Sequence, residues 1–264
     1  MTPTPPLRAD CTADSAGGLT FDVAAREGGD TAHLMLRRRD GDDEVGLPLV
    51  PVAEDRLRAA LPSSVALPEG RWDAYARLAD GEPLRLLPGV TDLSSLADRA
   101  PSGLLGHVAV RIPYATRRGN LTVRSWLRAP HAETDGPRPA DGGLTVRGRV
   151  YGTELASGAA YAELRRRPDA GGAGVRRLDV AADRTEFRLD VDYGTLEPGV
   201  WDLWLRPAGE AGPAVRVARL LDDVADKQPV FSFPRARVTT PHGTLEAVPH
   251  YTWDNDLSVS VTAL

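Results

Sequence analysis

The sequence predicts an all-β protein made of two tandem antiparallel β-sandwiches, and three observations carry this prediction. A Pro/Gly turn followed by an aromatic strand occurs twice, at residues 67–78 and 196–206. Short segments that alternate apolar and polar residues, separated by turn residues, fill most of the chain, as in β-sandwiches. No long segment shows the hydrophobic period of a helix.

The repeated stretch has the alternation of a strand with one buried face. Side chains on a strand point to opposite faces with a period of two. Trp72 and Trp201 therefore belong to apolar faces that we expect in the core, where a Trp buries a large area. Tyr75 and Trp204 then lie on the outward faces. They are candidate stacking platforms for a sugar; the favoured alternative is that a neighbouring loop or the sister domain covers them.

The first copy reads as a series of short strands after a tail. Residues 1–16, rich in Pro, Thr and Ala, are predicted to be a mobile tail. Residues 88–105 are predicted to form a longer connection with one helical turn near 92–97. The predicted strands lie at 18–23, 32–36, 45–52, 56–60, 71–78, 83–87, 107–112 and 120–127.

Residues 130–141 lose all periodicity and contain three prolines, so they are predicted to be a linker. After them the chain repeats the landmarks of the first half in the same order, which predicts an internal duplication. The matched landmarks are Gly18–Phe21 with Gly143–Val146, Leu36–Arg39 with Leu164–Arg167, Arg85–Leu87 with Arg219–Leu221, and Pro113–Leu121 with Pro249–Leu257.

The predicted domains are residues 17–129 and 142–264, each long enough to bury its own core. About seven or eight strands per copy at sandwich spacing indicate immunoglobulin-like domains. One domain of sixteen strands is the weaker alternative.

Composition narrows the class of protein. The 264 residues are 42% hydrophobic and 26% charged, as in soluble globular proteins, and the net charge of −5 argues against nucleic acid or an anionic membrane as partner. No apolar run is long enough for a membrane span, and the N-terminus lacks the pattern of a secretory signal, so we expect a cytoplasmic location. Cys11 is the only cysteine, which excludes a disulfide framework.

No catalytic signature is present, whether a nucleophile elbow, a phosphate-binding loop or a dinucleotide fingerprint. The five histidines lack metal-ligand spacing. A Ser/His/Asp triad that assembles only in space stays open. The acidic residues at 40–44 and 254–256 do not fit a calcium loop and are interpreted as solvated turns. We therefore predict no cofactor, no metal site and no enzyme activity.

An arginine triplet occurs in each copy, at Arg37–Arg39 and Arg165–Arg167. Guanidiniums bind phosphates and carboxylates in a bidentate manner, so an anionic polymer is one interpretation. Because a strand alternates faces, the three side chains of a triplet cannot face one way together. Pairing with nearby acidic residues is therefore the favoured interpretation.

The loop before each final strand is the strongest surface candidate. Aromatic rings beside planar polar groups suit sugar recognition; a structural role at the rim of a sandwich is the alternative. The candidate residues are Tyr114, Arg117 and Arg118 in the first copy, and Tyr251, Trp253 and Asp254 in the second.

The ending Pro-Tyr/His-x-Thr-x-x-x-Asn/Asp-Leu, after a Pro/Gly turn and a Trp-Asp strand, resembles the C-terminal regions of actinobacterial family 2 glycosyltransferases. It is also similar in plan to the tandem immunoglobulin-like module of wall-teichoic-acid glycosyltransferases. The resemblance covers residues 17–264 and implies an accessory module for oligomerisation or polymer binding. The chain lacks a Rossmann-like catalytic region, so any transferase activity would belong to a partner.

Three functions follow from these observations. The first is a non-catalytic binding or assembly module, with a glycosyltransferase or its cell-wall glycopolymer as the partner. The second is a purely structural protein that interacts with other proteins or with itself, which predicts a large apolar patch. The third is an unrecognised hydrolase or transferase, which needs convergent titratable groups in a pocket.

Overall fold

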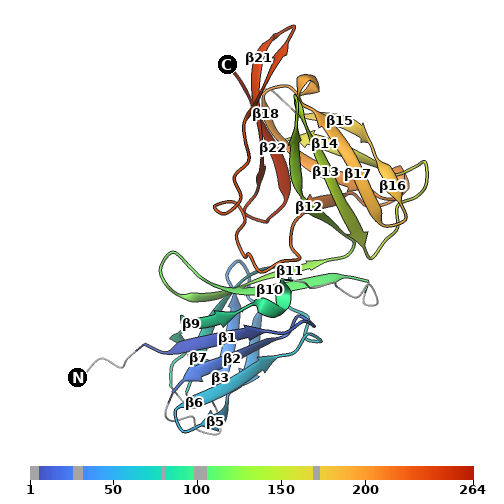
Figure 1. The fold of residues 1–264 in the computed structure, drawn as a ribbon. Helices are drawn as coiled ribbons and strands as arrows, with labels where there is room; N and C mark the ends of the chain where they lie inside the picture. The colour runs from blue at the N-terminus through green and yellow to red at the C-terminus, as the bar shows by residue number, and fades with distance from the viewer. Residues whose placement is uncertain (1–5, 26–31, 79–80, 98–105, 169–172) are drawn as a thin grey trace. The chain divides into compact units, whose positions relative to one another are not determined.

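A computed structural model describes residues 6–25, 32–78, 81–97, 106–168 and 173–264 of the chain. The described residues form strands joined by turns, with three short 3-10 helices, η1 (Ser94–Leu96), η3 (Tyr193–Thr195) and η4 (Gly209–Ala211), and no α-helix (Figure 1). The predicted all-β class is confirmed. The described chain divides into two compact units: unit 1 comprises 1–101, 109–127 and 221–225, and unit 2 the remainder.

Unit 1 contains two sheets. Its strands are β1 (Arg8–Ala13), β2 (Leu19–Ala24), β3 (His33–Arg38), β4 (Glu44–Pro48), β5 (Val50–Ala53), β6 (Arg56–Leu61), β7 (Gly70–Arg77), β8 (Leu84–Arg85), β9 (Leu87–Asp92), β10 (Val108–Ala115) and β11 (Leu121–Arg128). One sheet has the order β5-β6-β2-β1-β9, and the other has the order β10-β11-β7-β3-β4 with β8 on β7. The β1–β9 pair is parallel, whereas β1–β2, β3–β7 and β7–β11 are antiparallel.

The strands of unit 2 form one continuous sheet. Its strands are β12 (His131–Ala140), β13 (Gly143–Tyr151), β14 (Tyr161–Arg166), β15 (Gly174–Asp179), β16 (Ala181–Asp183), β17 (Glu186–Asp192), β18 (Gly199–Arg206), β19 (Val215–Ala218), β20 (Ala236–Thr240), β21 (Gly243–Tyr251) and β22 (Leu257–Ala263). The main order is β16-β17-β13-β12-β19-β18-β22-β21-β20, and β14 lies between β15 and β18.

In unit 2 one strand crosses from one layer to the other, and in unit 1 two consecutive strands share this role. In unit 2, β19 pairs in parallel with β12 and antiparallel with β18. In unit 1 the same crossing is split, because β8 pairs with β7 and β9 pairs in parallel with β1. The two units therefore share their strand pairing at this point.

The repeated turn and strand form the centre of each core. Trp72 on β7 and Trp201 on β18 are each 1% exposed, and the alternate residues of both strands are buried beside them. Each indole Nε1–H donates to a carbonyl oxygen four residues earlier, Pro68 at 3.0 Å and Glu197 at 2.9 Å. The indole satisfies its polar group against the Pro/Gly turn, so turn and strand act as one motif.

The predicted mobile tail is wrong for its described part. Strand β1 pairs with β2 and β9, and Ala9, Cys11 and Ala13 are buried in the core of unit 1. The alternation is present in the sequence, but small alanines and a cysteine give a weak hydrophobic signal. Residues 1–5 lie outside the described residues.

The predicted linker at 130–141 is also wrong, because strand β12 occupies most of it and pairs with β13 along its length. Proline removes a donor from a sheet and is tolerated where one side of a strand has no partner. On its other side β12 pairs with β19 only at Ala132 and Glu133, so the later Pro137 and Pro139 lie where that side has no described partner.

The predicted connection at 88–105 begins as a strand instead. Most of β9 lies within this segment, because its parallel pairing with β1 extends to Asp92. The helical turn expected near 92–97 is present as η1. Residues 98–105 lie outside the described residues.

Candidate functional site

Tyr75 lies half-buried on the outward face of β7, as the alternation predicts. Two guanidiniums flank its ring: the Cζ of Arg37 on β3 is 5.1 Å from the ring centroid, and that of Arg85 on β8 is 4.9 Å. Guanidiniums at these distances are attracted to the ring as cation–π partners. The ring is thus held by side chains of both neighbouring strands and is not a bare platform.

Trp204 has the same environment on β18 of unit 2. The Cζ of Arg165 on β14 is 4.5 Å from its ring centroid, and that of Arg216 on β19 is 5.2 Å. Arg216 is the cross-strand partner of Trp204, as Arg85 is of Tyr75. Arginines of adjacent strands therefore supply the covering that the sequence led us to expect from a loop or the other domain.

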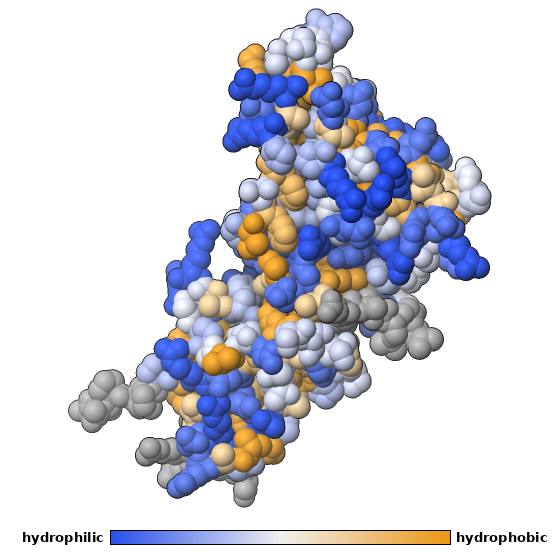
Figure 2. Space-filling model, in the orientation of Figure 1, coloured by the Kyte–Doolittle hydropathy of each residue, from blue (hydrophilic) through white to orange (hydrophobic). Residues whose placement is uncertain are grey.

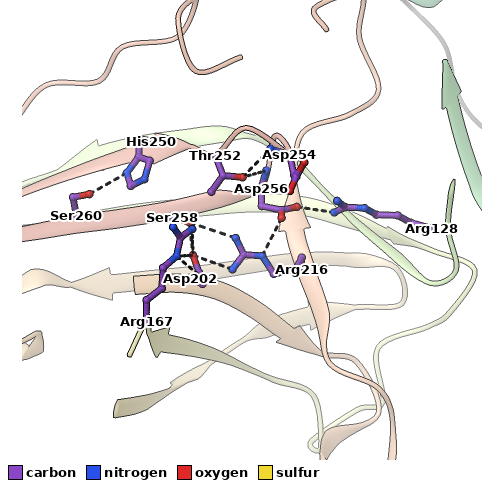
Figure 3. Close-up of polar contacts among 10 residues, drawn as sticks. All are labelled: Arg128, Arg167, Asp202, Arg216, His250, Thr252, Asp254, Asp256, Ser258 and Ser260. Atoms are coloured by element: carbon purple, nitrogen blue, oxygen red, sulfur yellow. Dashed lines mark hydrogen bonds and ion pairs between the residues drawn. The ribbon is translucent and has the colours of Figure 1, made fainter. Parts of the chain in front are cut away.

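Near Tyr75 and near Trp204, one carboxylate forms ion pairs with two arginines. In unit 1 the Oδ1 of Asp73 pairs with Arg39 at 2.7 Å and with Arg85 at 2.8 Å, and it accepts a hydrogen bond from the Thr122 hydroxyl at 2.8 Å. In unit 2, Asp202 Oδ1 pairs with Arg167 at 2.8 Å and Arg216 at 3.2 Å, and it accepts from the Ser258 hydroxyl at 2.7 Å (Figure 3).

These contacts keep both carboxyl groups ionised. Burial acts to raise the pKa of Asp73, but its hydrogen bonds to Arg39 and Thr122 and the charge of Arg85 bring that pKa below 3.8. Burial also acts to raise the pKa of Asp202, but the hydrogen bond from Arg167 and the charge of Arg216 outweigh this effect, so the pKa of Asp202 is lowered as well. Neither carboxyl group is suited to donate a proton at neutral pH.

A cavity of about 400 Å³ lies next to the unit 1 cluster. Its lining combines the Tyr75 ring with three guanidiniums and four carboxylates. The lining residues are Arg37, Arg38, Arg39, Gly41, Asp42, Asp43, Glu44, Asp73 and Tyr75. Three positive against four negative groups give a formal lining charge of −1.

The arginine triplets pair with acidic residues; two arginines of the first pair with the acidic stretch that follows it, as predicted, whereas two arginines of the second pair with residues distant in sequence. In the first triplet Arg37 pairs with Glu44 at 2.6 Å and Arg38 with Asp43 at 2.9 Å, both near or in the following turn. In the second, Arg166 pairs with Glu197 at 3.0 Å and Arg167 with Asp202, which lie before and on β18.

The loops before the final strands are tight turns with matched geometry. In unit 2 the Thr252 N–H donates to the Asp256 carbonyl, and Thr252 Oγ1 accepts from the N–H groups of Asp254 and Asp256 (Figure 3). Asn255 completes the turn with a left-handed φ of 61°. In unit 1 the Thr116 N–H donates to Asn120, and Gly119 has a φ of 74°.

These turns place the predicted contact residues differently. Arg117 and Arg118 are exposed, as is Asp254, and Trp253 is 54% exposed. Tyr114 is half-buried, and its phenol lies close enough to Arg39 and Arg85 to act on the pKa of both guanidiniums, so it borders the Asp73 cluster.

Tyr251 was wrongly predicted as a surface contact. It is 0% exposed, and its ring packs edge-on against Phe231 and Phe233 at centroid distances of 5.9 Å. The reason is the period of two along β21, which turns Leu245, Ala247 and Tyr251 toward the core of unit 2.

The histidine nearest to serines does not form a catalytic triad. His250 Nδ1 is 3.4 Å from the Ser260 hydroxyl, while the Asp202 carboxylate binds Ser258 and two arginines (Figure 3). A triad needs the carboxylate on the histidine ring, where it orients the base. Burial lowers the pKa of His250.

The described residues contain no group of three or more His, Cys, Asp or Glu side chains arranged to hold a metal ion. In the acidic stretch at 254–256, Asp256 pairs with Arg128 at 2.7 Å and with Arg216 at 3.3 Å. No helix in the described part of the chain is long and apolar enough to cross a membrane.

Large hydrophobic side chains reach the described surface at a few places. On the face that Figure 2 shows, hydrophobic groups alternate with hydrophilic ones, which cover most of the surface. The exposed large hydrophobic residues are Val50, Val52, Leu84, Val90, Val175, Val230, Trp253 and Leu264.

Sequence reasoning missed Arg85, Arg216, Thr122 and Ser258, which complete the two clusters. It also aligned Arg85 with Arg219, whereas cross-strand pairing makes Arg216 the equivalent. An arginine on the strand that pairs with β7 or β18 at this point was the available signal, but the matching Arg-Leu-Leu triplets obscured it.

No family model matches the chain, and no curated protein matches it. Solved structures with some similarity include TarS of S. aureus, with TM-score 0.36 and 11% identity over 70% of this chain and 35% of TarS. Residues 217–571 of TarS give TM-score 0.31 and 13% identity, over 71% of this chain and 56% of that one. A pullulanase from Anoxybacillus sp. LM18-11, complexed with maltotriose, gives TM-score 0.27 and 9% identity, over 76% and 24%. These values carry no argument about function.

Proposed function

We propose that the chain is a non-catalytic sugar-binding module and that unit 1 holds its ligand in the cavity beside Tyr75. The observation that carries the proposal is the combination of an aromatic ring with paired guanidiniums and carboxylates in one cavity. A ring packs on the apolar C–H face of a sugar, while the planar polar groups donate and accept hydrogen bonds with its hydroxyls.

The charge of the lining favours a neutral sugar over an anionic polymer backbone. Each arginine of the lining already has a carboxylate partner, Glu44 for Arg37, Asp43 for Arg38 and Asp73 for Arg39. With a formal lining charge of −1, the cavity has no net attraction for phosphate groups.

The state of Asp73 supports binding without hydrolysis. Glycoside hydrolysis needs one carboxylic acid whose pKa is raised so that it protonates the leaving group. The pKa of Asp73 is lowered by its hydrogen bonds and by neighbouring arginines, so this residue accepts hydrogen bonds and does not supply a proton.

We extend the proposal to a sugar-substituted cell-wall polymer, contacted through its sugars, with a glycosyltransferase as the partner that supplies catalysis. The sequence resemblance motivates this step. The matched clusters of Asp73 and Asp202 support an internal duplication of one ancestral domain. A cytoplasmic location stays a prediction.

The proposal is tested on an array of neutral oligosaccharides that also carries sugar-free poly(ribitol phosphate). We expect binding to neutral sugars but not to the polyanion, followed by calorimetry on the best binder. Tyr75→Ala should weaken that binding at least about tenfold, which corresponds to ~1.4 kcal/mol. Trp204→Ala, which removes a half-buried aromatic ring of unit 2 outside this cavity, is the matched control. Preference for the polyanion, or unchanged affinity in the folded Tyr75→Ala variant, would reject the proposal.

A further inference from the structure

A second and larger cavity lies within unit 2, in the layer that does not contain Trp204. Its volume is about 800 Å³, within the range of small-ligand sites, and its lining comes from β12, β13, β16 and β17. The lining residues are Glu133, Asp135, Arg147, Gly148, Arg149, Tyr151, Ala181, Ala182, Asp183, Glu186, Phe187 and Arg188. The lining contains one tyrosine, three arginines and four carboxylates. The Tyr75 cavity is lined by the same numbers of these groups, on different strands.

Several of these charges are already engaged. Arg149 pairs with Glu186 at 2.6 Å, and Arg188 lies 3.6 Å from Asp190. Glu133 accepts from the Leu220 N–H through both oxygens, at 3.0 and 2.9 Å, and lies 2.7 Å from His131 Nε2.

The charged groups of the lining that have no described partner carry a net negative charge. Among the described contacts, Asp135 and Asp183 have no ion pair or hydrogen bond through their carboxylates, and Arg147 has none through its guanidinium. Two carboxylates against one guanidinium leave a local excess of one negative charge for a ligand.

The two carboxylates lie on opposite sides of the cavity. Asp135 is on β12 and Asp183 on β16, with β13 and β17 between them, so they are separated by three interstrand spacings, about 14 Å. Asp135 is also the extra residue of a β-bulge, where the register to β13 shifts between Thr134 and Gly136. Bulges re-aim side chains next to functional sites.

Apolar and aromatic groups lie between these ends. The Phe187 ring packs across Gly148, its cross-strand partner, where a Cβ would approach the ring to 2.7 Å. The ring of Tyr151 stacks on buried His131 at a centroid distance of 6.4 Å and an interplanar angle of 18°. The cavity thus offers the half-buried Tyr151 ring to C–H groups and carboxylates to cationic groups at both ends, whereas Phe187 is 3% exposed and belongs to the core of unit 2.

We propose that this cavity binds an oligosaccharide that carries protonated amines, held at its ends by Asp135 and Asp183. The inference rests on the proposed function in that the chain is a sugar-binding module, but it concerns a site separate from the Tyr75 cavity. An amine supplies the positive charge that the lining lacks, and a sugar ring supplies C–H groups that the half-buried Tyr151 ring contacts.

Calorimetry on the full chain at about pH 6, where amines are protonated, tests the proposal with two probes that share the sugar backbone and differ at the amino groups, which are protonated in one and acetylated in the other. These are the trisaccharide of glucosamine and its fully N-acetylated form, chitotriose. We expect the glucosamine form to bind at least about tenfold more tightly. The double variant Asp135→Asn, Asp183→Asn should remove this preference, and Asp179→Asn, an exposed aspartate outside the cavity, should retain it.

Two further measurements separate the explanations. Trilysine carries the charge without the sugar, and affinity equal to that of the glucosamine trisaccharide would overturn the assignment to a sugar. Equal affinity for the two trisaccharides, or a preference that persists in the double variant, would overturn the site itself. Tyr75→Ala should keep the amine preference, so a failure of the Tyr75 cavity is distinguishable from a failure here.

Discussion

At the scale of single residues, the two clusters show how a half-buried carboxylate organises its surroundings. Asp73 Oδ1 receives two guanidiniums and a hydroxyl, and Arg85 and Arg37 in turn flank Tyr75. The ring position therefore depends on charges that Asp73 balances. Removal of this carboxylate leaves two partly buried guanidiniums without their partner.

We expect Asp73→Ala to lower the free energy of unfolding of unit 1 by about 2 kcal/mol, since partly buried charged groups lose their hydrogen-bond partner. Urea unfolding followed by tryptophan fluorescence measures this change. Asp42→Ala is the control, because Asp42 is exposed, and should stay within about 0.5 kcal/mol. Equal effects of the two substitutions would show that the cluster does not stabilise the fold.

At the scale of elements, the repeated turn and strand depend on a glycine at the first strand position. Gly70 and Gly199 have φ of 156° and 145°, a region that other residues rarely adopt. A Cβ on Gly199 would lie 2.6 Å from the Nε of Arg166, whose side chain crosses the turn to pair with Glu197. The same crossing occurs in unit 1, where Arg38 donates to the Glu69 carbonyl at 2.8 Å.

Gly199→Ala should therefore destabilise unit 2 by about 1–3 kcal/mol through backbone strain and displacement of Arg166. Thermal unfolding monitored by circular dichroism measures the shift. The matched control is Gly46→Ala on edge strand β4, where a Cβ meets no atom within 4 Å, and we expect a change close to zero. A Gly199→Ala variant as stable as the parent would contradict the role assigned to the turn.

At the scale of the whole molecule, each unit carries its own cluster of one carboxylate among arginines, and these clusters couple stability to pH. The pKa of Asp73 and that of Asp202 are lowered from 3.8 in the folded chain, despite the opposing effect of burial. A carboxyl group whose pKa is lower in the folded chain than in the unfolded one stabilises the fold while it is ionised.

The lowered pKa values of Asp73 and Asp202 predict how the free energy of unfolding changes with pH. The stability from Asp73 and Asp202 is present above the ordinary pKa of 3.8 and is lost as pH falls through their lower folded values. Unfolding free energies between about pH 7 and pH 3 should therefore decline mainly below about pH 4. The variant Asp73→Asn, Asp202→Asn should be less stable at neutral pH and decline less steeply in acid. An unchanged acid slope in that variant would assign the pH dependence to other groups.

The sequence by itself determined the all-β class and the elements with strong alternation. Trp72 and Trp201 were predicted in the core and are buried, and Tyr75 and Trp204 were predicted on the outward faces and lie there. A period of two is a local property of a strand, so it can be read without knowledge of the partner strands.

Only the tertiary structure decided what those outward side chains contact. Strand β12 looked like a linker because its prolines hide its alternation, and β1 looked like a tail because alanines and a cysteine give a weak signal. Tyr75 and Arg85, or Asp73 and Thr122, meet only through the pairing of β7 with β8 and β11. The contacts between side chains depend on the register between strands that are distant in sequence. A shift of that register by one residue turns every side chain to the other face of the sheet.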